Sequence, residues 1–196
     1  LGTAEIMENG LVQSEDMPRF AGSIHKETQR LIRMVNDIIK LSRLDEGGVV
    51  QWETVSLRAA AESAVERLRL AAQQKEVHLT LEGDCAPVQA VRQIVEEMIY
   101  NLCDNAVKYN KEQGTVSVSV LTAGKEGILM VQDTGIGIPQ EDQSRIFERF
   151  YRVDKMRSRA IGGTGLGLSI VKDTVESRGG QITAGARKGG GTVCTV

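Results

Sequence analysis

The sequence predicts an α+β fold in which helices cover a mixed sheet, with an α-helical hairpin in front of it. Residues 115–121 and 127–133 alternate apolar and polar side chains as strands do. Strand and helix patterns intermix without a strict succession of strand and crossover helix, which favours helices on one face of a mixed sheet over a doubly wound parallel sheet. Residues 17–44 carry a narrow apolar stripe in steps of three, four and seven, typical of a helix that packs along partner helices.

The composition excludes several classes of protein. The net charge of −2 provides no overall basic field that would recruit nucleic acid or an acidic membrane surface. The 3 cysteines lie far apart without C-x-x-C spacing, which argues against a disulfide framework or a zinc site and fits a reducing cytosol. No apolar run approaches the roughly 20 residues of a membrane-spanning helix, and the first residues lack the pattern of a signal peptide. Their helical character indicates a fragment that begins inside an element.

The hairpin is predicted from two helical segments, residues 1–9 and 17–44, separated by a stop at Asn9-Gly10. Such a hairpin cannot bury both of its faces alone, so we expect dimerisation into a four-helix bundle. Asp45-Glu46-Gly47-Gly48 ends the second helix and marks a domain boundary. We therefore expect a hairpin domain over residues 1–46 and a second domain over residues 47–196.

The second domain is predicted to contain strands and helices in an irregular order. Ser56 is expected to cap a helix over residues 57–74. Further helices are expected to end at Tyr109 and to cover residues 140–147 and 166–177. The remaining strands are expected at residues 49–55, 77–82, 86–90, 180–186 and 191–196.

Polar side chains gather on one face of the helix that ends at Tyr109. Four of them fall within about 80° of arc: Glu97, Asn101, Asn105 and Lys108. The opposite side is apolar: Val95, Ile99, Leu102, Cys103 and Ala106. Two asparagines on one helical face lower helix propensity and do not help a core, so this ridge is a candidate binding surface. The alternative is a solvated polar face.

A carboxylate follows the apolar strand at residues 128–131. Asp133 begins D-T-G-I-G-I-P, and a carboxylate at the end of a buried strand needs a donor, which the exocyclic amine of a base would supply. Gly135 and Gly137 have no side chains, so a flat ring could approach the backbone. The alternative is an ordinary turn with Asp133 as a turn residue.

Glycines precede the predicted helix at residues 166–177: Gly162, Gly163, Gly165 and Gly167. Backbone amides at a helix N-terminus form a phosphate site. The spacing is neither that of a dinucleotide fold nor that of a P-loop. Basic residues in front of them would suit a lid over phosphates, or a solvated loop: Arg149, Arg152, Lys155, Arg157 and Arg159.

Taken in order, these motifs resemble the ATP-binding catalytic domain of sensor histidine kinases. N-L-C-D-N-A-V-K-Y is similar to the N box of that family, D-T-G-I-G-I-P to its first glycine box, F-E-R-F-Y-R to its F box and G-T-G-L-G-L to its second glycine box. Residues 17–46 resemble the second helix of the dimerisation and histidine-phosphotransfer domain. The resemblance implies the helix–sheet sandwich of the GHKL (Bergerat) ATPases and an ATP-dependent protein-histidine kinase of a two-component system.

The resemblance also implies roles for individual residues. Asn105 would bind Mg²⁺, and Glu97, Lys108 and Arg152 would be catalytic, with Glu97 as general base or orienting group. Asp133 would accept a hydrogen bond from the adenine amine. The other positions implied to bind the nucleotide are Asn101, Tyr109, Gly135, Gly137, Ile138, Gly163, Thr164, Gly165, Leu166, Gly167 and Leu168, together with Asn105 and Lys108.

One part of the family pattern is missing. The H box, which carries the phosphorylated histidine, is absent, and Leu1-Gly2-Thr3-Ala4-Glu5 resembles sequence about ten residues after it on the same helix. His25 is expected to be a surface histidine and His78 a structural one. The chain should therefore bind ATP and Mg²⁺ without phosphorylating itself in the usual way.

The resemblance further implies partners and alternatives. The expected partners are the receiver domain of a response regulator and a second copy of the hairpin, without nucleic acid, in a cytoplasmic domain of a membrane-anchored protein. One alternative is an ATP-gated conformational machine of the same superfamily, such as a type II topoisomerase, mismatch-repair or chaperone ATPase. The other is a nucleotide-binding scaffold without transfer.

Overall fold

A mixed sheet forms the centre of the second part of the chain. The computed structural model describes residues 3–45, 52–154, 164–177 and 179–196. The sheet has five strands, in spatial order β2 (His78–Gly83), β4 (Thr115–Ala123), β5 (Glu126–Asp133), β7 (Thr192–Thr195) and β6 (Thr183–Ala186). Strands β2 and β4 are parallel, whereas the other neighbours are antiparallel. The predicted mixed sheet is confirmed.

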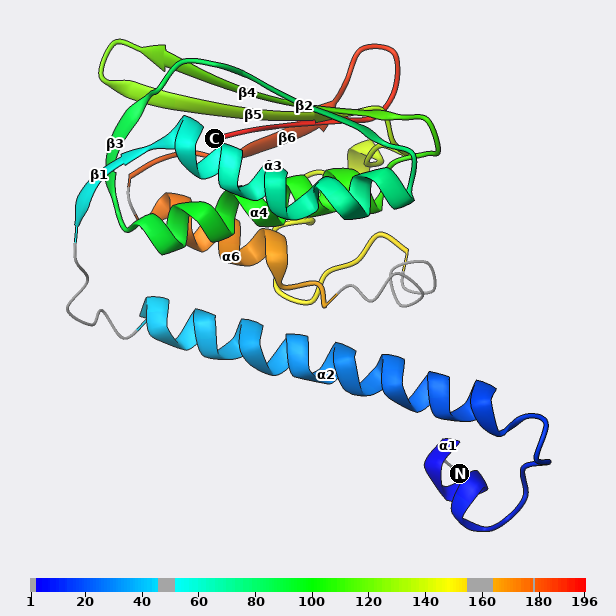
Figure 1. Cartoon of the computed structure of the whole chain (residues 1–196). Coiled ribbons are helices and arrows are strands. Elements are labelled where there is room, and N and C mark those ends of the chain that lie inside the picture. The colour runs from blue at the N-terminus through cyan, green and yellow to red at the C-terminus, as the bar shows by residue number, and fades with distance from the viewer. Residues whose placement is uncertain (1–2, 46–51, 155–163, 178) are drawn as a thin grey trace.

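Helices cover one face of this sheet, as predicted (Figure 1). They are α3 (Leu57–Gln74), α4 (Arg92–Lys108) and α6 (Gly167–Glu176). Alternation along β4 turns Val116, Val118 and Val120 toward these helices, and all three are fully buried. The apolar side of α4 packs in the same core, where Ile99 and Cys103 are fully buried. The face of α4 opposite the predicted polar ridge is therefore the face that packs into the hydrophobic core.

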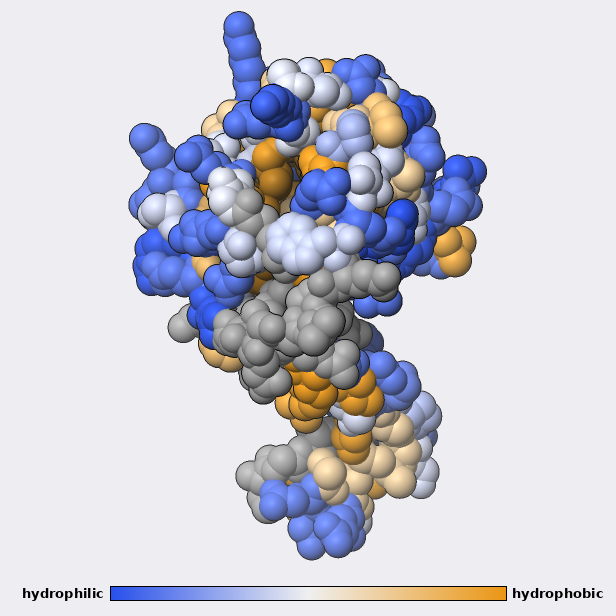
Figure 2. Space-filling view, turned by 90° about the vertical axis from the view of Figure 1, so that its left-hand side faces the viewer, coloured by the Kyte–Doolittle hydropathy of each residue, from blue (hydrophilic) through white to orange (hydrophobic). Residues whose placement is uncertain are grey.

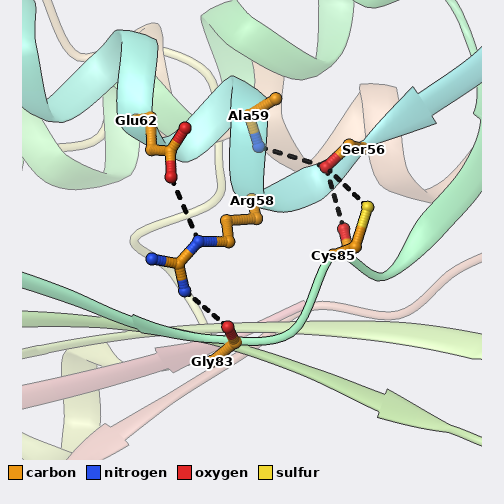
Figure 3. Close-up of polar contacts among 6 residues, drawn as sticks. All are labelled: Ser56, Arg58, Ala59, Glu62, Gly83 and Cys85. Carbon is orange, nitrogen blue, oxygen red and sulfur yellow. Dashed lines mark hydrogen bonds and ion pairs between the residues drawn. The ribbon is translucent and has the colours of Figure 1, made fainter.

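Hydrogen bonds join the start of α3 to the turn after β2 (Figure 3). The Ser56 hydroxyl accepts from the Ala59 amide at 3.2 Å, which confirms the predicted cap, and donates to the Cys85 carbonyl at 3.0 Å. Arg58 donates to the Gly83 carbonyl at 2.5 Å and to Glu62 at 3.1 Å. These contacts fix α3 on the edge of the sheet, and α3 in turn supports α4.

The two predicted helices of the hairpin are present as α1 (Thr3–Glu8) and α2 (Met17–Asp45). Gly10, with φ of 66°, ends the first of them. Helix α2 lies beside α6 and away from the sheet, and Met34 packs against Leu166 and Ile170 (Figure 1). Much of its apolar surface is exposed, and an orange surface is visible on this lower part of the molecule (Figure 2): Leu31, Ile32, Val35 and Ile39.

Two expectations about local structure were wrong in part. A helix was expected over residues 140–147, but only the 3-10 helix η1 (Gln140–Asp142) forms there, followed by turns. Tertiary contacts decide this segment: the Phe150 amide donates to the Gly165 carbonyl at 2.9 Å, and the Tyr151 hydroxyl donates to Asp142. The strand expected at 49–55 is reduced among the described residues to β1 (Glu53–Ser56), which pairs with β3 (Pro87–Ala90) in a separate two-stranded sheet.

The proposed domain boundary at residues 46–47 falls outside the described residues and stays a prediction. Within the described parts of the chain, no helix has both the length and the apolar character needed to cross a membrane.

Candidate nucleotide-binding site

A cavity of about 440 Å³ opens between α4, the end of β5, the segment after it and the start of α6. This volume lies within the range of sites for small molecules, roughly 300–1,000 Å³. Most of the residues proposed from the sequence line this one cavity: Glu97, Asn101, Asn105, Lys108, Tyr109, Asp133, Gly137, Ile138, Arg152, Thr164, Gly165, Gly167 and Leu168. Segments far apart in the sequence thus contribute to one site.

Three of the proposed residues are not part of the described lining. Gly163 lies outside the described residues. Leu166 is fully buried and packs with Ile170 and Met34. Its amide donates to the Thr164 hydroxyl at 3.3 Å, so Leu166 stabilises the glycine loop without lining the cavity. Gly135 has a steric role, because a Cβ there would lie 2.3 Å from the Tyr109 carbonyl oxygen.

Asp133 lies at one end of the cavity, where β5 ends. Its Oδ1 accepts hydrogen bonds from the amides of Gly135 at 2.8 Å and Thr192 at 3.2 Å. Burial raises the pKa of Asp133 above its usual value, although these donors oppose the shift. A carboxylate has about four lone-pair sites, so it keeps acceptor capacity for a ligand.

Strand β7 also contributes to this end of the cavity, which was not predicted from the sequence. Thr192 and Cys194 line it, and burial raises the pKa of the Cys194 thiol to about 12. Gly191, with φ of 95°, passes so close to β5 that a Cβ would lie 2.0 Å from the Asp133 carbonyl oxygen. The glycine run at 189–191, where the strand predicted at 191–196 begins, was the available signal for this close approach.

The polar ridge of α4 forms the long wall of the cavity. Lys108 pairs with Asp104 at 2.5 Å, a partner that the helical-wheel argument overlooked. The ammonium of Lys75 donates to the carbonyls of Val107, at 3.0 Å, and Lys108, and so stabilises the end of this helix. A Cβ on Gly167 would lie 3.7 Å from the side-chain oxygen of Asn101, so the glycine loop and the ridge adjoin.

Arg152 provides a direct test of whether an anion fits. Its Nε and Nη2 atoms are buried without a hydrogen-bond partner in the described part of the chain. An unsatisfied buried donor costs about 1–3 kcal/mol, and a phosphate oxygen would satisfy it. The residues present therefore fit the phosphates of a nucleotide.

A metal ion would need oxygen ligands from the nucleotide itself. Among the described residues, no group of three or more His, Cys, Asp or Glu side chains could hold a metal ion. Asn105 offers an amide oxygen in the cavity. Mg²⁺ commonly takes one or two protein ligands together with substrate phosphates, so this donor set is compatible with Mg²⁺.

Two other lining residues come from helices that carry none of the nucleotide-binding motifs. Helix α2 contributes Asn36 and helix α3 contributes Arg67. The rest lie between or beside the predicted positions: Tyr100, Leu102, Asp104, Ala106, Val131, Ile136, Ile146, Tyr151, Val153 and Asp154. No short-range pattern in the sequence marks α2 or α3 as part of the site.

Comparison with known proteins agrees with this geometry. Residues 90–196 match the model of the histidine kinase-, DNA gyrase B- and HSP90-like ATPase family, and this match covers more than half of the chain. The chain belongs to this ATPase family. Its similarity to sensor histidine kinases further identifies it as a sensor histidine kinase ATPase domain of two-component signalling, in agreement with the resemblance seen in the motifs.

The relatives of this ATPase domain are longer proteins. Sensor histidine kinase WalK of Bacillus subtilis is 36% identical to it, over 97% of this chain and 32% of WalK. Sensor-like histidine kinase SenX3 of Mycolicibacterium smegmatis is 35% identical, over 100% of this chain and 53% of SenX3. The chain thus spans about a third to a half of these curated relatives.

A solved structure shares the fold over almost the whole chain. Histidine kinase ThkA, in a crystal structure with response regulator protein TrrA, superposes with a TM-score of 0.77 at 22% identity. The match covers 98% of this chain and 54% of that one. The predicted α+β sandwich of the GHKL type is confirmed.

Proposed function

We propose that this chain binds ATP with Mg²⁺ and transfers the γ-phosphoryl group to a histidine on a helical hairpin, from which it passes to an aspartate of a response regulator. One observation carries the proposal. Arg152, whose buried Nε and Nη2 have no partner in the part of the chain that the structure describes, shares a cavity with the Asp133 carboxylate, the asparagine side chains of α4 and the glycine loop. A triphosphate joined to a base matches this combination of a cationic end and an acceptor end.

At the base end, Asp133 would accept a hydrogen bond from the exocyclic amine of adenine. Because Gly135 and Thr192 donate to the same carboxylate, its orientation is fixed before a ligand arrives. Guanine presents an oxygen at the corresponding position and would face the carboxylate without a shared proton. The site should therefore select ATP over GTP.

At the phosphate end, Lys108 and Arg152 would neutralise charge, and the backbone near Gly165 and Gly167 would donate to phosphate oxygens. Gly165, with φ of 77°, adopts a conformation that side chains rarely allow, and the Phe150 amide binds its carbonyl at 2.9 Å. Asn105 would hold Mg²⁺, which supplies neutralisation of phosphate charge when bound. Asn101, beside Gly167, would order the same region.

The transfer itself requires positioning more than covalent chemistry by the protein. The bond from the γ-phosphorus to its bridging oxygen breaks, and ADP keeps the electron pair. A nitrogen of the acceptor imidazole forms the new bond to phosphorus. Glu97, at the N-terminal end of the polar ridge, would accept the proton that the ring then loses.

The partner proposals rest on α2 and on the relatives. The exposed apolar side chains of α2, such as Leu31 and Val35, would pack in a homodimeric four-helix bundle. ThkA was solved with a response regulator protein, and we propose a receiver domain as the second substrate here as well. We also propose a domain boundary at residues 46–47. We further propose that this chain is a cytoplasmic part of a membrane-anchored protein and that nucleic acid is not a partner.

Label transfer tests the proposal directly. The chain is mixed with γ-labelled ATP, Mg²⁺ and a separate hairpin that bears the missing histidine, and we expect acid-labile label on that hairpin. The chain alone should bind ATP but take up no label. Asn105→Asp should change the Mg²⁺ affinity and leave the fold unchanged.

The two alternatives give different results in the same assay. Release of phosphate without any labelled protein would favour an ATP-driven conformational machine. An absence of saturable binding of a fluorescent ATP analogue with Mg²⁺ would favour a scaffold.

A further inference from the structure

Among the described residues, two arginines line the cavity, Arg67 and Arg152, and they differ from other arginines in their pairing. Five others each have a carboxylate partner at 2.7 to 3.3 Å: Arg58, Arg69, Arg92, Arg145 and Arg149. Neither Arg67 nor Arg152 has an ion pair with any residue that the structure describes. A cation held at a cavity without a carboxylate partner is available to an anionic ligand.

Arg67 is nevertheless held in place. Its guanidinium carbon lies 4.1 Å from the centroid of the Tyr100 ring, within the range of a cation–π interaction. Tyr100 is half-buried and packs against the main core, so the ring is a fixed support. A guanidinium stacked on a ring keeps its N–H groups directed outward in the plane, where they can bind phosphate oxygens.

The position of this pair in the cavity is set by α4. The lining side chains follow the helix from Lys108 through Asn101 to Tyr100 and Glu97, a span of about 16 Å at 1.5 Å per residue. Asp133 belongs to the other end, because Ile136, shortly after it in the chain, donates its amide to the Tyr109 carbonyl at 3.2 Å. Tyr100 and Arg67 therefore lie away from the end proposed for adenine.

The same end of the cavity faces the helical hairpin. Asn36 of α2 lines the cavity, and Met34, two residues earlier, packs on Leu166. Leu166 precedes Gly167, which adjoins Asn101. These contacts place α2 next to the N-terminal half of the α4 ridge, on the side from which an acceptor on such a hairpin would approach.

We infer that Arg67, held by Tyr100, is a further catalytic residue, which binds the oxygens of the transferring phosphoryl group on the side of the acceptor histidine. Arg152 would bind the nucleotide phosphates within the cavity. Arg67 would bind the oxygens of the γ-phosphoryl group as that group moves toward the acceptor. This inference rests on the proposed function. It assigns a role to α3, a helix that carries none of the sequence motifs.

The test compares Arg67→Gln with Arg69→Gln in the label-transfer assay with the supplied hairpin. Arg69 is an exposed arginine on the same helix, is paired with Glu66 at 2.7 Å and does not line the cavity. At saturating ATP and hairpin, we expect Arg67→Gln to slow transfer on the order of tenfold to a hundredfold. This is less than the roughly 10²–10³ of an enclosed donor, because Arg67 is exposed. Arg69→Gln should keep the unmodified rate, and Arg67→Lys should recover part of it.

Two further readouts separate this role from others. The affinity for ATP should change less than about threefold in Arg67→Gln, and the KM for the hairpin should stay the same. A raised KM with an unchanged kcat would show a docking role and overturn the inference. Equal rates for the two glutamine variants would also overturn it, while leaving the proposed function intact. If the unmodified chain transfers no label at all, the proposed function itself fails.

Discussion

The core under the sheet and the nucleotide cavity are built on the two sides of one helix and follow opposite rules. On the core side of α4, Ile99 and Cys103 are fully buried among apolar neighbours. On the cavity side, two buried nitrogens of Arg152 have no hydrogen-bond partner within the described part of the chain, and Asp133 is a half-buried carboxylate with a raised pKa. The core thus maximises stability, whereas the cavity retains unfavourable groups that a ligand can satisfy. The following predictions test this contrast, from the largest expected effect to the smallest.

Ile99→Ala should give the largest loss of stability. Ile99 is fully buried in the main core, and such a truncation costs about 2–5 kcal/mol of unfolding free energy. Denaturant titration measures this loss. The ATP affinity of the protein that remains folded should change little, and a loss of affinity as large as that of the cavity variants would contradict the separation of the two sides.

Asp133→Asn should have the opposite effect: it should lower the ATP affinity without a comparable loss of stability. Loss of a hydrogen bond to a charged acceptor is worth about 1.5–3 kcal/mol, so ATP affinity should fall roughly 10- to 150-fold and preference over GTP should weaken. Titration with ATP and GTP measures both effects. Equal affinity of the unmodified protein for ATP and GTP would contradict the role of Asp133. Asp84→Asn, at an exposed carboxylate outside the cavity lining, is the matched control.

The pH dependence of stability gives a second test at Asp133. Because its folded pKa is raised above the ordinary value of about 3.9, the carboxyl group contributes stability below that pH, and this contribution is lost as pH rises through the folded pKa. Without nucleotide, Asp133→Asn should therefore equal or exceed the unmodified protein in unfolding free energy at pH 7. A clearly less stable variant at pH 7 would show that the charged form is favoured in the fold.

We expect Arg152 to bind the γ-phosphate of ATP. Arg152→Gln should therefore weaken binding of ATP by about tenfold and affect ADP less. Removal of its unpartnered buried nitrogens should leave the unfolding free energy unchanged or higher. Calorimetric titration of both nucleotides, with thermal unfolding, measures these effects. Arg149→Gln, which loses only the exposed pair with Asp173, should bind both nucleotides normally. An equal loss of affinity for ATP and ADP would contradict a contact between Arg152 and the γ-phosphate.

Ser56→Ala should give the smallest effect, about 1 kcal/mol of unfolding free energy, because it removes the cap of α3. Ser56 does not line the cavity, so ATP affinity should stay the same. Thermal unfolding and ATP titration measure the two quantities, and a large drop in affinity would show that α3 controls the cavity from its first turn.

Local patterns predicted most of the elements of this fold. Alternation predicted β4 and β5, and the serine before an apolar run predicted the start of α3, because both depend on neighbours in the chain. The segment 140–147 was misassigned as a helix. Its turns depend on the contact of Phe150 with Gly165, a residue distant in the sequence, and local propensity does not register such a contact.

The residues of the site likewise fall into two groups, those that local patterns predicted and those that only tertiary packing brought to the cavity. The spacing of Asn101 and Asn105 on one helical face, and the position of Asp133 at a strand end, are properties of the sequence alone. Thr192, Cys194, Arg67 and Asn36 reach the cavity only because β7 pairs with β5, α3 packs on α4 and α2 lies against α6.

By itself, the sequence determined the periods of helix and strand, the order of the motifs and the chemical types of the groups that could bind a nucleotide. These features are local, since a helical face or a turn glycine is defined within a few residues. Only the tertiary structure decided which groups share a cavity, that two Arg152 nitrogens have no partner among the residues described and that the Arg67 guanidinium lies over the Tyr100 ring. Those facts arise from packing between distant segments, where burial and the loss of water change the energy of each charge.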